Sequence, residues 1–476
     1  MTLSFHKNER DYQDKYEPCV LMGATKAATG VPDTLVTYHG IGGCRMTMEH
    51  LRMDNVPDGL FVPIISTAPD QSSVIYGGAD KLERGLEQTL SDAKRRKINL
   101  KLIWLFTSCA TSIVGDDILS AARKIEEREN IKVIPIDTPG FLGGDKTGHE
   151  LVYTALVENY AKYDAKKNSN SINILGPQLI GSKYWPWDYQ EIVRLMEGAD
   201  IHANVTFCYK STLDNYNSFG AAVSNYNLSG ESFDEFADLS SRYNVEMWGD
   251  DLVYPIGIAN TEEWYLKIAE RFGNIEKAKK LMKEDMNRVM KRIKGDYNSS
   301  WFLSDISGKH IGILGNAKYA ASLARCLYYD FNCYPVVVGL WGETPASIEN
   351  AKRILSEMDA YCDIDVYENP TFFEYGNAIK KAEVDFAIGT RYDMRLVRGI
   401  GIPHISLGQN YFLNNFSFIP WPTFGIKGVL GLMTELARLI EENIKYEEDG
   451  WIANSFIAPL GHKESGSEVV KKCHRG

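Results

Sequence analysis

Residues 102–117 read Leu-Ile-Trp-Leu-Phe-Thr-Ser-Cys-Ala-Thr-Ser-Ile-Val-Gly-Asp-Asp, an apolar run that ends in a polar turn carrying Cys109. A short run of bulky apolar residues predicts a buried strand of a parallel sheet, here Leu102–Phe106. Open parallel sheets bind ligands beyond the carboxyl ends of their strands. Cys109 therefore stands where such a sheet places its functional groups.

Two further cysteines have comparable surroundings. Cys44 follows the apolar run Leu35–His39 across a glycine turn, and Cys19 precedes a small-residue stretch that we expect to open a helix. Thiolates from separate loops are what an iron–sulfur cluster needs, and nearby glycines let the backbone approach a bulky inorganic core. A zinc site would need closer pairs such as Cys-x-x-Cys, which the sequence lacks. We expect Cys19, Cys44 and Cys109 to converge at one sheet edge.

Composition limits the class of protein. The 476 residues exceed the size of one hydrophobic core, so two or three domains are expected. A net charge of −11 argues against nucleic-acid and anionic-membrane partners. No apolar run reaches the roughly 18 residues that span a bilayer. The charged N-terminus does not resemble a secretion signal, and eight dispersed cysteines do not form a disulfide scaffold, so a cytoplasmic location is expected.

Apolar runs alternate with amphipathic stretches along the chain, which is typical of α/β proteins. We expect three Rossmann-like domains with parallel sheets flanked by helices. Their expected ranges are 1–165, which carries the cluster cysteines, 166–300, which includes a charged helical connector at 261–294, and 301–446, followed by a tail at 447–476. The expected strands are Leu35–His39, Phe61–Ser66, Leu102–Phe106, Val133–Asp137, Ile172–Leu175, Ile201–Phe207, Gly308–Gly315, Tyr334–Leu340, Val384–Gly389 and Pro403–Leu407.

Several other motifs favour structural interpretations. We expect the remaining cysteines to pack in the core or, for Cys473, to lie in the polar tail; the core set is Cys208, Cys326, Cys333 and Cys362. Asp116 and Asp117 are expected to cap the following helix. His39 either tunes the cluster through hydrogen bonds or bonds to backbone at a strand end.

Phosphate binding is not supported by the glycine-rich stretches. Residues 140–147 resemble a P-loop, but Asp145 separates the glycines from Lys146 and puts a carboxylate where phosphate would sit. The pair Gly312 and Gly315 lacks the full dinucleotide fingerprint. The aromatic stretch at 184–187 fits a partner interface or a loop packed onto the core.

In combination, these stretches resemble the nitrogenase component 1 family, which includes the molybdenum–iron protein subunits and related reductases. Weaker similarity extends over most of the chain. The matching residues are Pro18-Cys19 with Gly23-Ala24, His39-Gly40 with Gly43-Cys44, Gly77-Gly78, Thr107 and Cys109 with Ile113, Gly115, Asp116 and Asp117, and Thr138-Pro139-Gly140-Phe141 with Gly143.

The resemblance implies a paired assembly. Two homologous subunits each contribute three cysteines to a P-cluster-type iron–sulfur cluster, of eight irons and seven sulfides, at their interface. Cys19, Cys44 and Cys109 match these positions. A separate ATP-hydrolysing iron protein supplies electrons, which pass to an iron-containing active-site cofactor in the α-type partner. A heterotetramer of two α-type and two β-type subunits is expected.

This chain resembles the β-type subunit. The region where an α-type subunit carries its cofactor cysteine falls near Ala222–Glu231, which holds no cysteine, and His404 lies in an apolar run. Gly140 stands where β-type nitrogenase subunits have a serine that can ligate the oxidised cluster. We therefore favour a nitrogenase-like reductase such as methylthio-alkane reductase, which cleaves carbon–sulfur bonds. The alternatives are a nitrogenase β subunit proper, a non-catalytic cofactor-assembly scaffold and a homodimeric tetrapyrrole reductase.

Overall fold

The protein is described here from a computed structural model, which defines residues 1–7, 18–55, 64–294, 297–410 and 420–442. The chain divides into a unit of Met1–Leu432 and a unit of Met433–Gly476, of which only the end of helix α17 (Gly425–Glu442) is described. The tail expected at 447–476, including Cys473, lies outside the described residues. None of the described helices has the length and apolar character that crossing a membrane requires.

The first sheet has four parallel strands in the order β3-β2-β4-β5. Its central strands β2 and β4 are buried along their whole length, as strands covered on both faces are. The strands are β2 (Thr34–His39), β3 (Ile64–Ser66), β4 (Leu102–Thr107) and β5 (Lys132–Ile136). The accompanying helices are α1 (Val20–Thr29), α2 (Gly42–Asn55), α3 (Gln71–Tyr76), α4 (Ala79–Arg96), α5 (Cys109–Val114), α6 (Ile118–Glu129) and α7 (Asp145–Tyr160).

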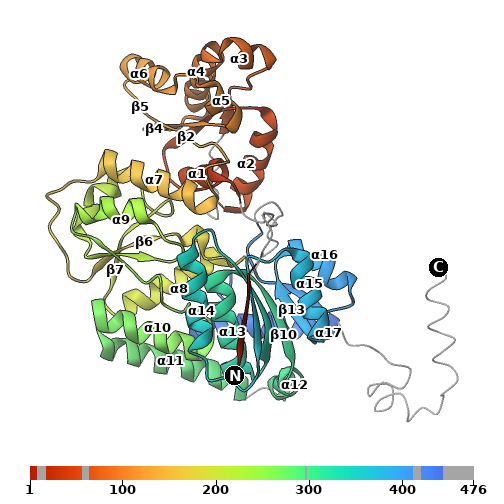
Figure 1. Cartoon of the computed structure of the whole chain (residues 1–476). Helices are drawn as coiled ribbons and strands as arrows, with labels where there is room; N and C mark the ends of the chain where they lie inside the picture. The colour runs from red at the N-terminus through yellow and green to blue at the C-terminus, as the bar shows by residue number, and fades with distance from the viewer. Residues whose placement is uncertain (8–17, 56–63, 295–296, 411–419, 443–476) are drawn as a thin grey trace. The chain divides into compact units, whose positions relative to one another are not determined.

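The second sheet also has four parallel strands, in the order β7-β6-β8-β9. The charged stretch expected as one connector forms two helices, α10 and α11, which run side by side and break at Gly273 (Figure 1). The strands are β6 (Ser171–Leu175), β7 (His202–Thr206), β8 (Ser224–Asn227) and β9 (Glu246–Trp248). The helices are η1 (Pro177–Leu179), α8 (Trp185–Gly198), η2 (Leu213–Ala221), α9 (Asp234–Ser241), α10 (Gly257–Phe272) and α11 (Ile275–Lys294).

The third sheet has six parallel strands in the order β1-β12-β11-β10-β13-β14. Its edge strand β1 comes from the N-terminus and is drawn in red beside the later strands in Figure 1. The strands are β1 (Leu3–Lys7), β10 (His310–Asn316), β11 (Tyr334–Trp341), β12 (Ile364–Glu368), β13 (Phe386–Gly389) and β14 (His404–Ser406). The helices are α12 (Tyr297–Ile306), α13 (Ala317–Phe331), α14 (Pro345–Ser356), α15 (Phe372–Lys381) and α16 (Arg391–Gly399).

The α/β class with parallel sheets flanked by helices is confirmed. Each expected strand is present, although the start of Phe61–Ser66 lies outside the described residues. The sequence analysis did not anticipate strands β1, β8, β9 and β12. β1 pairs with β12 in the third sheet, although its residues fall in the range expected for the first domain. The domain boundaries remain predictions.

Helices α1 and α7 approach so closely that their backbones touch. A Cβ added at Gly148 would lie 2.2 Å from the carbonyl oxygen of Val20, and one added at Gly23 would lie 2.3 Å from that of Asp145. No side chain larger than hydrogen fits at either position without moving a helix. The two glycines therefore set the distance between the helix that starts after Cys19 and the helix that follows the turn at 140–144.

A buried ion pair joins the same two helices. Lys26 Nζ lies 2.8 Å from Asp145 Oδ2, and both side chains are at most 2% exposed. Burial alone would raise the pKa of Asp145, but the Lys26 ammonium and His149 outweigh it and lower that pKa. His149 Nε2 lies 3.1 Å from Oε1 of Gln178, and the Gln178 amide donates to the Lys26 carbonyl. The network extends from α1 and α7 to η1.

Replacing Lys26 with methionine is expected to destabilise the fold by about 3–5 kcal/mol, because Asp145 is left as a buried charge without its cation. The midpoint of urea unfolding at neutral pH measures this loss. The matched control is Lys124→Met, since Lys124 pairs with Glu83 at the exposed surface and should unfold like the wild type. Equal unfolding midpoints for the two variants would contradict the expected contribution of the buried ion pair to stability.

Replacing Gly148 with alanine should separate α1 from α7 and lower stability by about 1–3 kcal/mol, the usual cost of overpacking a close contact. The control is Gly399→Ala at the end of α16, where an added Cβ meets no atom within 4 Å. Thermal unfolding of both variants tests the contact. A Gly148→Ala protein that melts with the Gly399→Ala protein would show that the helices move apart without loss.

Candidate functional site

Cys19 caps the N-terminus of α1 and is half-buried. It forms an isolated bridge with Gly144, and the next backbone amide, of Val20, donates to the carbonyl of Gly143. Burial raises the pKa of the Cys19 thiol, backbone hydrogen bonds oppose this, and the nearby Cys109 and Cys44 add to it. The expectation that Cys19 opens a helix is confirmed.

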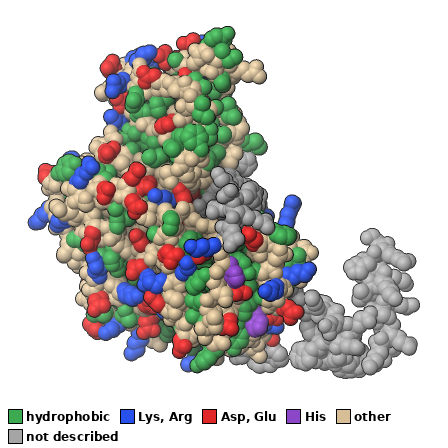
Figure 2. Space-filling model, in the orientation of Figure 1, with side chains coloured by type: hydrophobic (Ala, Val, Ile, Leu, Met, Phe, Trp, Pro, Cys, Tyr) green, Lys and Arg blue, Asp and Glu red, His purple; other side chains and the backbone are tan. Residues whose placement is uncertain are grey.

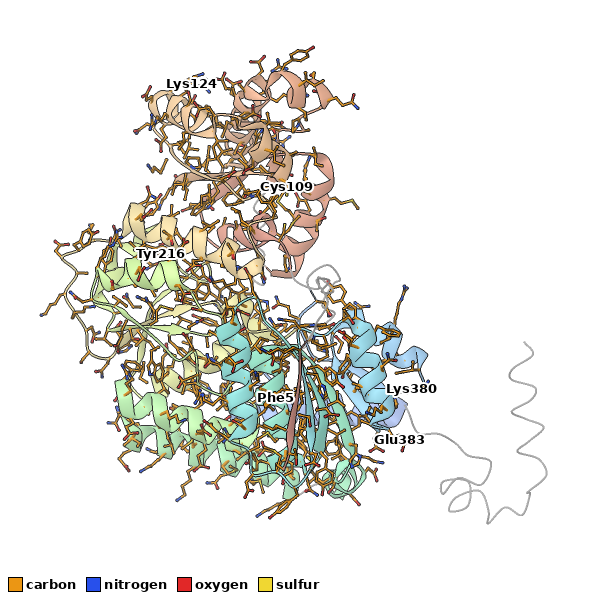
Figure 3. The ribbon with its side chains drawn as sticks, in the orientation of Figure 1. Phe5, Cys109, Lys124, Tyr216, Lys380 and Glu383 are labelled. Atoms are coloured by element: carbon orange, nitrogen blue, oxygen red, sulfur yellow. The ribbon has the colours of Figure 1, made fainter. Side chains whose placement is uncertain are left out.

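Cys109, labelled in Figure 3, is the first residue of α5. Its side chain is exposed. The preceding Ser108 forms a capping box with Thr111, which fixes the start of this short helix directly after β4. The backbone amide of Gly140 donates to Cys109 Sγ at 3.0 Å. Cys109 therefore lies beyond the carboxyl end of β4, as the sequence indicated.

Cys44 lies in the first turn of α2 and is half-buried. The sequence analysis placed it after a glycine turn, and the structure adds that Gly42 and Gly43 already belong to the helix. A Cβ added at either glycine would meet no atom within 4 Å, so this turn has open space beside it. Strands β2 and β4 are in register, with His39 opposite Thr107, so Cys44 and Cys109 follow from the same sheet edge.

Gly140 lies between two of the thiols. A Cβ added there would be 3.2 Å from Cys109 Sγ and 3.4 Å from Cys19 Sγ. Both sulfurs therefore lie against the backbone of residue 140. Because this residue is a glycine, no side chain stands between them. A serine at this position would place its side chain against both sulfurs.

The cysteines suit an iron–sulfur cluster better than a single metal ion. Among the described residues, no group of three His, Cys, Asp or Glu side chains is arranged to hold one ion. Three thiols with a glycine backbone beside them match the ligand chemistry of a larger iron–sulfur core. The three thiols, the bare backbone at Gly140 and the open space at Gly42 and Gly43 therefore fit such a cluster.

His39 and Asp116 form a structural bridge beside the cysteines. His39 is buried, with Nδ1 2.8 Å from Thr67 Oγ1 and Nε2 2.8 Å from Asp116 Oδ2. The other Asp116 oxygen accepts from the amide of Gly78. Both imidazole nitrogens therefore have protein partners, which favours a structural role for His39, although these partners are side chains and not the backbone that the sequence analysis considered. Asp117 caps α6 as expected, but Asp116 bridges to His39 instead of capping.

Exposed apolar side chains lie on the helices and turns that carry the cysteines and on α3 beside them. We call this group the apolar rim: it comprises Ile41, Met46, Val74, Ile75, Tyr76, Ile113, Phe141 and Leu142. Phe141 and Leu142 follow Gly140, Ile113 lies in α5, and α3, which carries residues 74–76, contacts α5. Figure 2 shows hydrophobic side chains gathered over the elements of the first sheet. Large exposed apolar groups around polar ligands are typical of a protein interface.

The P-loop-like stretch has its amides occupied by the protein itself. The Glu343 carboxylate accepts from the backbone amides of Gly144 at 2.8 Å and Lys146 at 2.9 Å. It also accepts from the Thr147 amide and hydroxyl. The anion position at the N-terminus of α7 is thus filled by a carboxylate, in agreement with the interpretation that this stretch does not bind phosphate.

The other candidate residues are structural. Cys208, Cys326 and Cys333 are buried as expected, whereas Cys362 is only half-buried. His404 is buried and its Nε2 lies 2.9 Å from Asp393. The aromatic stretch at 184–187 packs onto the core at the start of α8, where Tyr184 and Trp185 are buried.

The family profile described as "Nitrogenase component 1 type Oxidoreductase" matches residues 19–441. The chain belongs to this family. Its members are subunits of nitrogenase-like oxidoreductases, generally bind iron–sulfur clusters, and work with an α-type partner and an iron protein. The resemblance inferred from the cysteine stretches is confirmed at this level.

Individual relatives are distant but match along almost their whole length. The vanadium–iron protein β chain of Trichormus variabilis nitrogenase is 24% identical, covering 95% of this chain and all of the relative. A molybdenum–iron protein α chain from Methanothermobacter marburgensis is 23% identical over 90% of each chain. A solved structure titled nitrogenase Cp1 at pH 6.5 superposes with a TM-score of 0.70 at 20% identity, covering 93% of this chain and 96% of that one. That structure supports the fold.

Sequence reasoning missed two contributors to the site's surroundings. The bridge between His39 and Asp116 joins residues 77 positions apart, so no local pattern reveals it. Glu343 comes from the loop after β11 and has no motif of its own. The order of strands and turns along the sequence was the feature that predicted a common position for the three cysteines.

The iron-free protein should show a graded reactivity of its thiols. Cys109 is exposed, whereas Cys208 is fully buried and burial raises its pKa well above the ordinary range, so an alkylating reagent should modify Cys109 much faster. A mass-spectrometric time course on the folded chain measures both rates. In urea the two rates should become similar. Equal rates in the folded protein would contradict the arrangement described here.

Proposed function

We propose that this chain is the β-type subunit of a nitrogenase-like reductase. It relays electrons from an ATP-dependent iron protein, through a P-cluster-type iron–sulfur cluster, to a metallocofactor in an α-type partner. The observation that carries the proposal is that the Cys19 and Cys109 sulfurs lie close together against the backbone of Gly140, with Cys44 nearby and the apolar rim on the neighbouring elements. Cys19, Cys44 and Cys109 are the proposed ligands.

The exposure of the thiols supports a cluster shared between subunits. Cys109 is exposed and the rim residues next to it are apolar, so a partner surface that covers them would bury both. We propose the homologous α-type subunit as that partner, in a heterotetramer with two copies of each subunit. The cluster supplies one-electron transfer, and the protein holds it away from water at the interface.

The β-type assignment rests on what the candidate cofactor region contains. Residues 222–231 form β8 and the turn after it, and they include no cysteine. His404 is the buried first residue of strand β14 and does not follow a polar turn, where an α-type subunit would carry its cofactor histidine. Both features favour a cofactor that is held mainly by the partner. We therefore assign no substrate-contacting catalytic residue to this chain.

For the substrate we propose a compound other than dinitrogen, with methylthio-alkanes, whose carbon–sulfur bond is reduced, as the favoured class. The departure at Gly140 from the serine of β-type nitrogenase subunits is the feature that supports this choice. A nitrogenase β subunit proper remains the first alternative. The second is a non-catalytic assembly scaffold; relatives at 21–24% identity include cofactor-biosynthesis and light-independent protochlorophyllide reductase proteins.

Replacing Cys109 with alanine should lower the iron and sulfide bound by the anaerobically purified complex and abolish substrate reduction, because one of three ligands is lost. The chain is co-expressed with its α-type partner, and iron and acid-labile sulfide are measured per complex. Cys326→Ala is the matched control, since Cys326 is buried in α13 and should leave the iron content unchanged.

The outcomes distinguish the candidate functions. Full iron content in Cys109→Ala would contradict the ligand assignment. A wild-type complex that binds iron but reduces neither dinitrogen nor methylthio-alkanes, and passes its cofactor to another protein, would identify the scaffold instead. Reduction of dinitrogen would identify the nitrogenase β subunit.

A further inference from the structure

The side chain of Tyr38 packs against the turn that connects β2 to Cys44. It is the fifth residue of β2 and is fully buried. A Cβ added at Gly40 would come within 2.1 Å of the Tyr38 hydroxyl oxygen, so the hydroxyl touches the backbone of the turn. A glycine at position 40 is therefore needed for the hydroxyl to reach this place.

The hydroxyl has no hydrogen-bond partner within the described part of the chain. An unpaired buried donor costs about 1–3 kcal/mol, so such a group calls for an explanation. Burial raises the pKa of Tyr38, and the neighbouring Cys44 side chain raises it further while the Ser108 hydroxyl opposes the rise. The phenol thus lies near the Cys44 thiol, but no hydrogen bond of ordinary geometry joins the two side chains.

The other polar side chains at this turn already have partners. His39 bonds to Thr67 and Asp116 through its two ring nitrogens, and the Ser108 hydroxyl is engaged in the capping box of α5. Tyr38 is therefore the side chain among these that has a donor to spare. A sulfur that becomes a negatively charged ligand is the acceptor that this donor lacks in the iron-free chain.

We propose that Tyr38 donates a hydrogen bond to the Cys44 sulfur when that sulfur ligates an iron–sulfur cluster, and that this bond raises the cluster's reduction potential. The inference rests on the proposed function and adds to it a residue that tunes the same site. Adding an electron increases the negative charge on the ligand sulfurs, so a donor stabilises the reduced cluster more than the oxidised one. Tyr38 is thus a positioning and tuning residue.

The test is Tyr38→Phe in the complete complex with the α-type partner. The substitution removes one oxygen and keeps the ring. Iron content should match the wild type, while an EPR-monitored redox titration should give a more negative midpoint potential. A tenfold loss in the one-electron equilibrium corresponds to about 59 mV. Tyr375→Phe is the matched control, because Tyr375 is also buried with an unpartnered hydroxyl but lies in α15, beside the third sheet.

The iron-free chain provides an independent readout. Because its hydroxyl has no partner there, Tyr38→Phe should unfold at or above the wild-type temperature. A clear loss of stability would show that the hydroxyl bonds to the protein itself and would overturn the proposal. An unchanged midpoint potential with full iron would also overturn it. If the wild-type complex holds no iron, both the proposed function and this inference are wrong. If the wild-type complex holds iron and only the Tyr38→Phe results contradict the expectation, the proposed function still stands.

Discussion

The contact between α1 and α7 is the constraint on which the cysteine site depends. Cys19 directly precedes α1 and the turn at 140–144 leads into α7, so the distance between these helices fixes where one thiol lies relative to Gly140. Two glycines allow the approach and a buried ion pair between Lys26 and Asp145 holds it. The geometry of the thiols is therefore set by close-packed backbone and charge behind the site, and it exists before any metal binds.

The same turn is held from its other side by carboxylates of distant parts of the chain. Glu343 accepts from the first amides of α7, and Glu231 accepts from the amides of residues 343 and 344. A carboxylate at a helix N-terminus interacts favourably with the helix dipole. Elements of all three sheets thus meet in one hydrogen-bonded chain that ends at the turn carrying Gly140. Residues with no ligand role can therefore affect the position of the thiols.

Prediction from the sequence was most successful for strands that are buried on both faces. The bulky runs of β2 and β4 and the cysteines that follow them were placed correctly, because such strands look the same in any parallel sheet. Strand β8 was missed because its buried side chains include Asn225 and Asn227, whose amides bond to other polar groups. Nothing in the sequence distinguishes Tyr38 from other aromatic residues of buried strands, because its unpaired hydroxyl depends on the position of the turn at Gly40. Ion pairs such as that between Lys26 and Asp145 join residues far apart in the sequence, so they could be found only from the tertiary structure.

The N-terminal strand β1 has a consequence for how the protein forms. Its partner β12 lies more than 350 residues later, since the Thr2 amide bonds to Asp363 across a separation of 361 positions. Residues 3–7 are thus synthesised well before their partner strand and pair with it only after the two smaller sheets have been synthesised. Such a pairing closes a very long loop and gives the chain a high contact order. Until it closes, one edge of β12 is an open template for other strands, and the largest sheet is complete only after residues 404–406 of β14 have been synthesised.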